Sequence, residues 1–214
     1  MDHLARFLRF FFHHLYHGLA FTYDLVAAAV SFGHWRDWIR AVIPFIEGKR
    51  VLELGHGPGH LQRFMLELGL DSAGLDESAQ MGRLARRRMA GARLPVCLAR
   101  GAAQRLPFPA GTFDSVVSTF PSEYIFDERT LREAHRVLKS SGRLIVLPAG
   151  WPKNPFLGWL YRATGESPGG TREAAQQNWM RPFYRAGFKT EARILEVQSG
   201  TLLILLARKP EENP

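Results

Sequence analysis

Residues 51–60 read VLELGHGPGH, with glycine at every second position from 55 to 59 and the acid Glu53 just before them. The apolar run 50–55 is typical of a strand, and in 59–69 apolar residues recur at helical spacing. Glycines between a strand and a helix let the backbone turn tightly and approach a ligand without Cβ clashes. The stretch therefore predicts a ligand-binding loop between a strand and a helix.

A second acid narrows the choice of ligand. Asp76 ends the next strand-like run, 71–76, and an acid at this distance from the glycines commonly accepts hydrogen bonds from ribose hydroxyls. The G-x-G-x-G spacing differs from the nicotinamide fingerprint, and the loop lacks the lysine of a triphosphate-binding P-loop. The Glu53 carboxylate repels a diphosphate but attracts an ammonium or sulfonium, by about 4 kcal/mol at ~4 Å for an effective dielectric of about 20. A nucleoside with a cationic end is therefore favoured over a purely structural turn.

Strand-like and helix-like patterns alternate from residue 51 onward, which predicts an α/β fold with a mostly parallel sheet covered on both faces. The expected strands are 50–55, 71–76, 93–101, 113–120, 143–149 and a pair within 188–209 that is joined at Ser199–Gly200. The expected helices are 59–69, 78–91, 127–142 and 171–187, the last broken near Pro182. We therefore predict a Rossmann-like, doubly wound, seven-stranded sheet with a terminal antiparallel hairpin strand.

Two aromatic-rich segments lie outside this alternation. We predict an N-terminal helical segment (1–45), a domain at 46–209 with an inserted cap (150–170), and a short tail (210–214). Because ligands bind beyond the carboxyl ends of strands in open α/β sheets, both aromatic segments could cover the crevice. They fit either ordinary core packing or a hydrophobic lid over an apolar acceptor, and the N-terminal segment also suits contact with a membrane surface.

Composition limits the other possibilities. The chain has 214 residues, 46% of them hydrophobic, and one cysteine, Cys97, which we expect to be buried. A single cysteine allows no intramolecular disulfide, which favours a reducing, cytoplasmic location. The formal charge of +8 is spread along the chain without a nucleic-acid-binding motif, so no nucleic-acid partner is expected. His13, His14 and His17 interrupt the N-terminal apolar run, which argues against a signal peptide or membrane span. They lack an acidic or cysteine partner nearby, so no metal is expected.

Four blocks of sequence carry a family resemblance. VLELGHGPG, GLDES, GAAQRLPFPAGTFDSVVSTF and LREAHRVLKSSGRLIVLPA resemble, in order and spacing, the class I S-adenosylmethionine-dependent methyltransferases. They are similar to the branch, methyltransferase type 11, that includes the ubiquinone/menaquinone-biosynthesis C-methyltransferases, as is YDLVAAAVSFGHWRDW (23–38). The resemblance implies an enzyme that transfers a methyl group from S-adenosyl-L-methionine to a small apolar or aromatic acceptor. An NPPY-type motif is replaced by TFPSEY, which argues against nucleic-acid and protein acceptors.

The resemblance also implies roles for individual residues. The cofactor would be held by Glu53, Gly55, His56, Gly57, Pro58 and Gly59 at its methionine end, by Asp76 and Glu77 at the ribose, by Ala102 and Ala103 at the adenine, and by Thr119 and Phe120 near the methyl group. The family often has Asp or Asn where this chain has Ala102. Backbone groups or Gln104 must then supply the missing hydrogen bond, or the adenine is held more loosely.

The acceptor side of the site is less defined. Orienting the acceptor in a dry pocket can contribute roughly 7–11 kcal/mol, and a general base is needed only where the acceptor loses a proton. The candidate bases are Glu123, Tyr124 and His34, each of which also has a plain packing or surface interpretation. His56 either fills the loop near the methionine moiety or lines the acceptor pocket. Two other functions stay open: a non-catalytic methyltransferase-like interaction module and a nucleic-acid methyltransferase.

Overall fold

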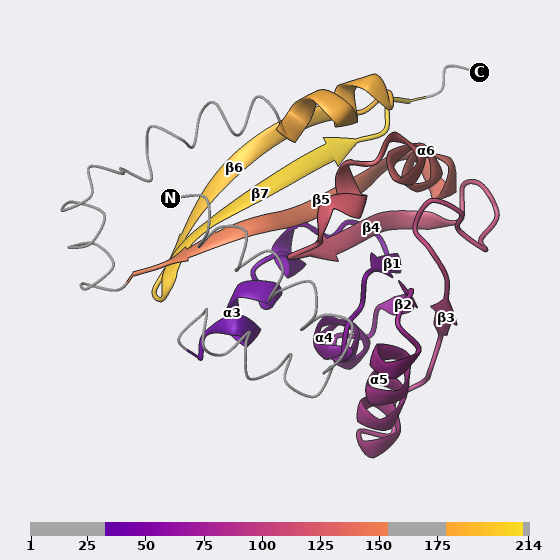
Figure 1. Cartoon of the computed structure of the whole chain (residues 1–214), viewed down its shortest axis with the longest axis vertical. Coiled ribbons are helices and arrows are strands. Elements are labelled where there is room, and N and C mark those ends of the chain that lie inside the picture. The colour runs from indigo at the N-terminus through magenta and orange to yellow at the C-terminus, as the bar shows by residue number, and fades with distance from the viewer. Residues whose placement is uncertain (1–32, 154–178, 212–214) are drawn as a thin grey trace, which may run out of the picture.

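Seven strands form one sheet in the order β3-β2-β1-β4-β5-β7-β6 (Figure 1). The computed structural model describes residues 33–153 and 179–211. The strands are β1 (Arg50–Leu54), β2 (Asp71–Asp76), β3 (Leu98–Arg100), β4 (Phe113–Thr119), β5 (Leu138–Pro152), β6 (Lys189–Val197) and β7 (Gly200–Arg208). Strands β1 to β5 pair in parallel, whereas β7 runs antiparallel to both of its neighbours. The predicted fold class is confirmed.

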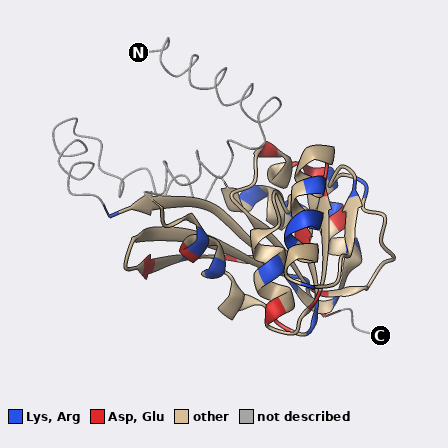
Figure 2. Cartoon of the chain, turned by 90° about the horizontal axis from the view of Figure 1, so that it is seen from below, with Lys and Arg blue, Asp and Glu red and all other residues tan. Residues whose placement is uncertain are grey.

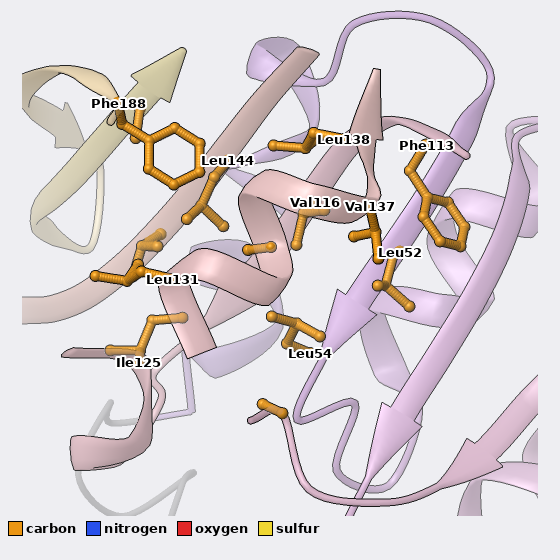
Figure 3. Packing of buried hydrophobic residues seen from close by; sticks show 14 of the residues in the cluster. Leu52, Leu54, Phe113, Val116, Ile125, Leu131, Val137, Leu138, Leu144 and Phe188 are labelled. Carbon is orange, nitrogen blue, oxygen red and sulfur yellow. The ribbon is translucent and has the colours of Figure 1, made fainter. Parts of the chain in front are cut away.

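Helices cover both faces of the sheet. They are α3 (Trp35–Arg40), the 3-10 turn η2 (Ile43–Phe45), α4 (His60–Glu67), α5 (Ala79–Gly91), the 3-10 turn η3 (Glu123–Phe126) and α6 (Glu128–Val137), with a further helical stretch at 179–185. Successive strand side chains point to opposite faces, so Leu52 and Leu54 of β1 pack toward α6 (Figure 3), whereas Val51 packs with α3 and α4. Each face thus has its own apolar core. Strand β1, which leads into the glycine loop, is therefore packed from both sides.

The boundary between α6 and β5 differs from the prediction. The helix expected over 127–142 begins at its cap Asp127, whose carboxylate accepts from the Arg129 N–H at 2.9 Å, but it ends at Val137. Residue 138 already belongs to β5, where Leu138 pairs with Phe113 of β4 and is fully buried. The carbonyl of Val137 accepts from the Thr112 N–H at 2.8 Å. Long-range pairing therefore overrides the local helical pattern.

Three further expectations need correction. The third strand, expected over 93–101, is shorter and spans only Leu98–Arg100 (β3). Pro95 offers no N–H for a ladder, and Arg93 has a φ of 55°. Cys97, which precedes β3 at the sheet edge, is exposed rather than buried. Residues 179–185 are helical and run through Pro182 without the expected break. The expectations for 1–32 and 154–178, including His13, His14 and His17, lie outside the described residues.

The described part of the N-terminal segment, residues 33–45, packs on the sheet. Trp38 of α3 is 1% exposed, and its Nε1 donates to Ser199 Oγ at 2.8 Å in the β6–β7 turn. The ring occupies space that Gly150 and Gly200 leave, since a Cβ at either would lie 2.9 Å from it. Trp38 thereby ties α3 to the long arms of β5 and β7. Within 33–153 and 179–211, none of the helices is both long and apolar enough to span a membrane.

Candidate functional site

The strand order reverses between β1 and β4, the place where open α/β sheets form their ligand crevice. Pairing of these two strands ends at Glu53 and Val117, whereas β1 stays paired to β2 through Leu54, and the Gly55 N–H still donates to the Leu75 carbonyl at 2.8 Å. In open α/β sheets this switch point, beyond the carboxyl ends of the strands, is where ligands bind. The glycine loop, Asp76 and the residues after β4 all lie at this end of the sheet.

The three loop glycines adopt a conformation that other residues rarely take. Gly55, Gly57 and Gly59 have φ values of 69°, 52° and 81°. A Cβ at Gly59 would lie 2.8 Å from the Ala85 Cβ of α5, so this glycine also permits close packing of α4 on α5. Gly57 has open space where a Cβ would be, which leaves its surroundings available to a ligand.

Asp76 anchors the loop as well as offering a ribose-binding carboxylate. Its Oδ2 accepts from the Gly57 N–H and its Oδ1 from the Ser78 N–H, both at 2.8 Å. A carboxylate has about four lone-pair sites, so capacity for hydroxyl donors remains. From the other side, Arg88 of α5 donates to the Pro58 carbonyl. Part of the basic run on α5 thus holds the loop rather than facing only solvent.

Glu53 is a buried carboxylate with a free oxygen. It is 2% exposed, and Oε2 has no hydrogen-bond partner among the described residues. Burial is the main reason that its pKa rises to about 8; a hydrogen bond from Gln62 opposes the rise, and the nearby charge of Asp76 adds to it. Such a group is stabilised by a cation placed against it. The residues present therefore fit a ligand whose ammonium group lies against Glu53.

His56 packs beneath the loop. The ring is 4% exposed, and Nδ1 lies 2.7 Å from the Gly57 carbonyl oxygen. Its other side faces β2, because a Cβ on Gly74 would lie 3.0 Å from His56 Cδ2. Burial lowers the pKa of the imidazole, although the Asp76 charge opposes this. This geometry favours the loop-filling interpretation over a wall of the acceptor pocket.

The residues after β4 place aromatic rings beside the crevice. Phe120 follows Thr119 with a φ of 48°, a conformation that costs energy for a bulky residue and is concentrated at functional sites. Its ring centroid lies 4.1 Å from that of Trp35 and 6.1 Å from that of Trp38. The sequence analysis assigned no role to Trp35. Its place beside His34, within the family-like block 23–38, could have marked it as a site residue.

The three candidate bases have very different surroundings. Glu123 is exposed on η3, whereas the next residue, Tyr124, turns inward and donates its hydroxyl to the Leu54 carbonyl at 3.0 Å. Burial raises the pKa of Tyr124 well above its ordinary value. The His34 side chain is 48% exposed, and its Nδ1 lies 3.7 Å from the Asp37 carboxylate. Tyr124 is therefore a partly buried hydrogen-bond donor at the end of the sheet, whereas Glu123 and His34 are exposed.

The expected adenine segment is held by α6. Ala103 is buried, Ala102 is exposed, and the Gln104 amide lies 3.4 Å from Asp127 Oδ2, so Gln104 is engaged with the α6 cap. The Leu106 N–H donates to Glu133 at 2.7 Å. Arg136 is paired with Glu133 and donates to the carbonyls of Leu106 and Phe108. This carboxylate–guanidinium pair fixes the loop that follows the two alanines.

Comparison with known proteins agrees with this geometry. Residues 52–146 match the family model described as a methyltransferase domain. The demethylmenaquinone methyltransferase of Thermus thermophilus is 35% identical over 67% of this chain and 68% of that protein. The ubiquinone/menaquinone biosynthesis C-methyltransferase of Escherichia coli O1:K1 is 36% identical over 65% of this chain and 59% of that protein. The solved structure of an S-adenosylmethionine-dependent methyltransferase from Aquifex aeolicus shares the fold, with a TM-score of 0.58, 20% identity, and coverage of 80% of this chain and 89% of that one. The chain therefore belongs to the class I S-adenosylmethionine-dependent methyltransferases, in the branch that includes the ubiquinone/menaquinone-biosynthesis enzymes, and its cofactor is S-adenosyl-L-methionine.

Proposed function

We propose that this enzyme methylates a ring carbon of a planar, apolar acceptor of the quinol type. The observation that carries the proposal is the contact of Phe120 with Trp35 at the carboxyl end of β4, beside the crevice. Two aromatic faces at that position suit an aromatic ring, since stacked or tilted ring pairs contribute about 0.5–1.5 kcal/mol beyond their burial. The two relatives, a demethylmenaquinone methyltransferase and a ubiquinone/menaquinone biosynthesis C-methyltransferase, point to the same acceptor class.

The chain's own residues hold the reactants. S-adenosylmethionine supplies an electrophilic methyl group when bound. We assign Glu53 and the loop Gly55–Gly59 to its methionine end, Asp76 and Glu77 to the ribose, and Ala102 and Ala103 to the adenine. Thr119 and Phe120 border the position of the methyl group. In this assignment Phe120 and Trp35 exclude water and orient the acceptor ring, which is the main contribution that methyl transfer needs.

Methylation of a ring carbon also releases a proton. The acceptor carbon forms a bond to the methyl group, the sulfur keeps the electron pair of the broken bond, and the ring then loses one proton. Of the candidate bases, His34 has support from the geometry, because it is exposed, adjoins Trp35 and has Asp37 beside its ring. Glu123 is the second candidate and, being exposed, would release the proton to solvent. The Tyr124 hydroxyl donates instead to the Leu54 carbonyl.

The distribution of charge gives no support to a nucleic-acid acceptor. Figure 2 shows basic and acidic positions interspersed over the described ribbon. Many of the arginines are paired, as Arg63 is with Glu67 at 2.7 Å and Arg132 with Glu128 at 2.9 Å. A buried carboxylate with a free oxygen, as at Glu53, is also an expensive feature for a module that binds no cofactor. These observations favour an enzyme acting on a small molecule.

The proposal can be tested by mass spectrometry of the acceptor. The purified protein is incubated with S-adenosylmethionine and a short-chain prenylated naphthoquinol, and we expect a product heavier by one CH₂ group, with the methyl on the ring carbon. Trp35→Leu should reduce this turnover, and Trp35→Phe should retain most of it. If S-adenosylhomocysteine binds but neither this quinol nor a benzoquinol is methylated, the acceptor proposal is wrong although the cofactor assignment stands.

A further inference from the structure

Two hydroxyl groups close the gap between β1 and β4 where their pairing stops. The ladder ends at Glu53 and Val117, so the next residue of β1, Leu54, lies beyond the β1–β4 pairing. The Ser118 hydroxyl donates to it at 2.8 Å and the Tyr124 hydroxyl at 3.0 Å. A buried carbonyl left without a donor would destabilise the end of the strand. These two side chains therefore supply hydrogen bonds to β1 just beyond the end of its ladder with β4.

The two hydroxyls also contact each other. Ser118 Oγ and Tyr124 Oη lie 2.9 Å apart, so two hydroxyl protons serve three oxygen–oxygen contacts. Every arrangement in which both protons are used leaves at least one proton on the Leu54 carbonyl. The carbonyl is thus satisfied whichever hydroxyl donates, and removing either hydroxyl leaves the other in place.

Tyr124 also fills the space above the first loop glycine. A Cβ on Gly55 would lie 2.5 Å from the Tyr124 hydroxyl oxygen and 3.4 Å from its Cζ. On the opposite side, the Gly55 N–H donates to the Leu75 carbonyl at 2.8 Å. The first residue of the loop is thereby held between β2 and the tyrosine.

We propose that Ser118 and Tyr124 are positioning residues for the cofactor, which act by fixing the end of β1 and, through it, Glu53 and the glycine loop. The inference rests on the established cofactor and does not depend on the proposed acceptor. It replaces the interpretation of Tyr124 as a base. The tyrosine hydroxyl is directed at a main-chain carbonyl in the protein interior, and a buried phenol stays protonated, as a donor must.

The first test is Tyr124→Phe, which keeps the ring and removes the hydroxyl. Loss of one such hydrogen bond predicts a dissociation constant for S-adenosylhomocysteine, and a KM for S-adenosylmethionine, raised about three- to tenfold. We expect kcat within about twofold and an unchanged pH–rate profile. The matched control is Tyr184→Phe, because the half-exposed Tyr184 also donates to a main-chain carbonyl, that of Thr190 at 3.0 Å, and should leave these values unaltered.

A second test uses the close approach of Tyr124 to Gly55. Gly55→Ala should abolish detectable S-adenosylhomocysteine binding in calorimetry, because its Cβ collides with the hydroxyl oxygen. Adding Tyr124→Phe removes that oxygen and leaves a 3.4 Å contact, so the double variant should bind more tightly than Gly55→Ala alone. Recovery will be partial because φ at Gly55 is 69°.

Ser118→Ala completes the set and covers the case in which Tyr124→Phe folds poorly. It should weaken the binding of S-adenosylhomocysteine about twofold. The Ser118→Ala/Tyr124→Phe variant should lose more binding free energy than the sum of the two single losses, because neither hydroxyl is then left to donate to the Leu54 carbonyl. Unchanged affinity in Ser118→Ala and Tyr124→Phe, with no recovery in the Gly55 pair, would overturn the proposal. A Tyr124→Phe defect confined to kcat, with a shifted pH profile, would overturn it in favour of a catalytic tyrosine.

Discussion

The backbone N–H of Gly57 donates to Oδ2 of Asp76 at 2.8 Å, which links the middle of the glycine loop to the end of β2. The acid that matches the ribose-binding position of the family therefore also shapes the loop that holds the rest of the cofactor. Changes at Asp76 act on both parts of the site, since its other oxygen accepts from the Ser78 N–H ahead of α5.

Asp76→Asn should therefore weaken cofactor binding by more than one ordinary hydrogen bond. Bonds to a charged group contribute about 1.5–3 kcal/mol, so we expect a dissociation constant for S-adenosylhomocysteine raised roughly tenfold to a hundredfold. Calorimetry measures this. Asp71→Asn is the matched control at the other end of β2, where an exposed carboxylate pairs with Arg50 at 3.2 Å and should have no effect on binding. Equal affinities in the two variants would contradict the dual role of Asp76.

Cofactor binding should release a proton from Glu53. With a pKa of about 8, the carboxyl is mostly protonated at pH 7 in the free protein, but an ammonium group favours the ionised form. Affinity for S-adenosylhomocysteine should thus rise as the pH increases from 6 to about 8, by up to about tenfold per unit. Calorimetry at pH 7 in buffers of different ionisation enthalpy should show close to one proton released. Glu53→Gln should bind weakly and release none; a wild-type protein that releases none would refute the prediction.

The same group gives a pH dependence to folding stability. Its pKa is raised from 4.5 to about 8, so between these values the folded state holds a proton that the unfolded state has lost. The stabilisation that comes from this tighter proton binding is fully present below pH 4.5 and is lost as the pH rises through about 8. Denaturant titrations of wild type and Glu53→Gln, without cofactor, should show a stability difference that changes across this window. A constant difference from pH 5 to 8 would argue against it.

Arg136→Lys should loosen the adenine side of the site. A lysine cannot donate to Leu106, Phe108 and Glu133 together as the guanidinium does. We expect about tenfold weaker binding of S-adenosylhomocysteine, with a similar loss for adenosine alone, because the loop after Ala103 is affected. Arg132→Lys on the same helix is the control, since its exposed pair with Glu128 contributes little. A loss for S-adenosylhomocysteine but not for adenosine would place the defect elsewhere.

Local patterns in the sequence were sufficient for the elements that carry the cofactor site. The strand 71–76 was predicted with the bounds of β2, and the helix predicted over 78–91 is α5 together with its cap Ser78, whose hydroxyl accepts from the Met81 N–H at 3.3 Å. Both depend on periodicity and on neighbouring residues, which a single sequence displays. A nucleoside with a cationic end followed from Glu53, the glycines and Asp76, because their spacing along one βαβ unit fixes their spacing in space, and the family resemblance then implied S-adenosylmethionine.

Contacts between distant segments were decided only by the folded chain. The sequence could place Tyr124 after the fourth strand, but its inward turn depends on where β1 and β4 stop pairing and on its contact with Leu54, 70 positions earlier. The contact of Phe120 with Trp35 and the end of α6 at Val137 likewise depend on which segments pack together. Local propensities are worth tenths of a kilocalorie per residue, whereas burying a large side chain is worth about 1.5–3 kcal/mol, so tertiary packing prevails where the two conflict.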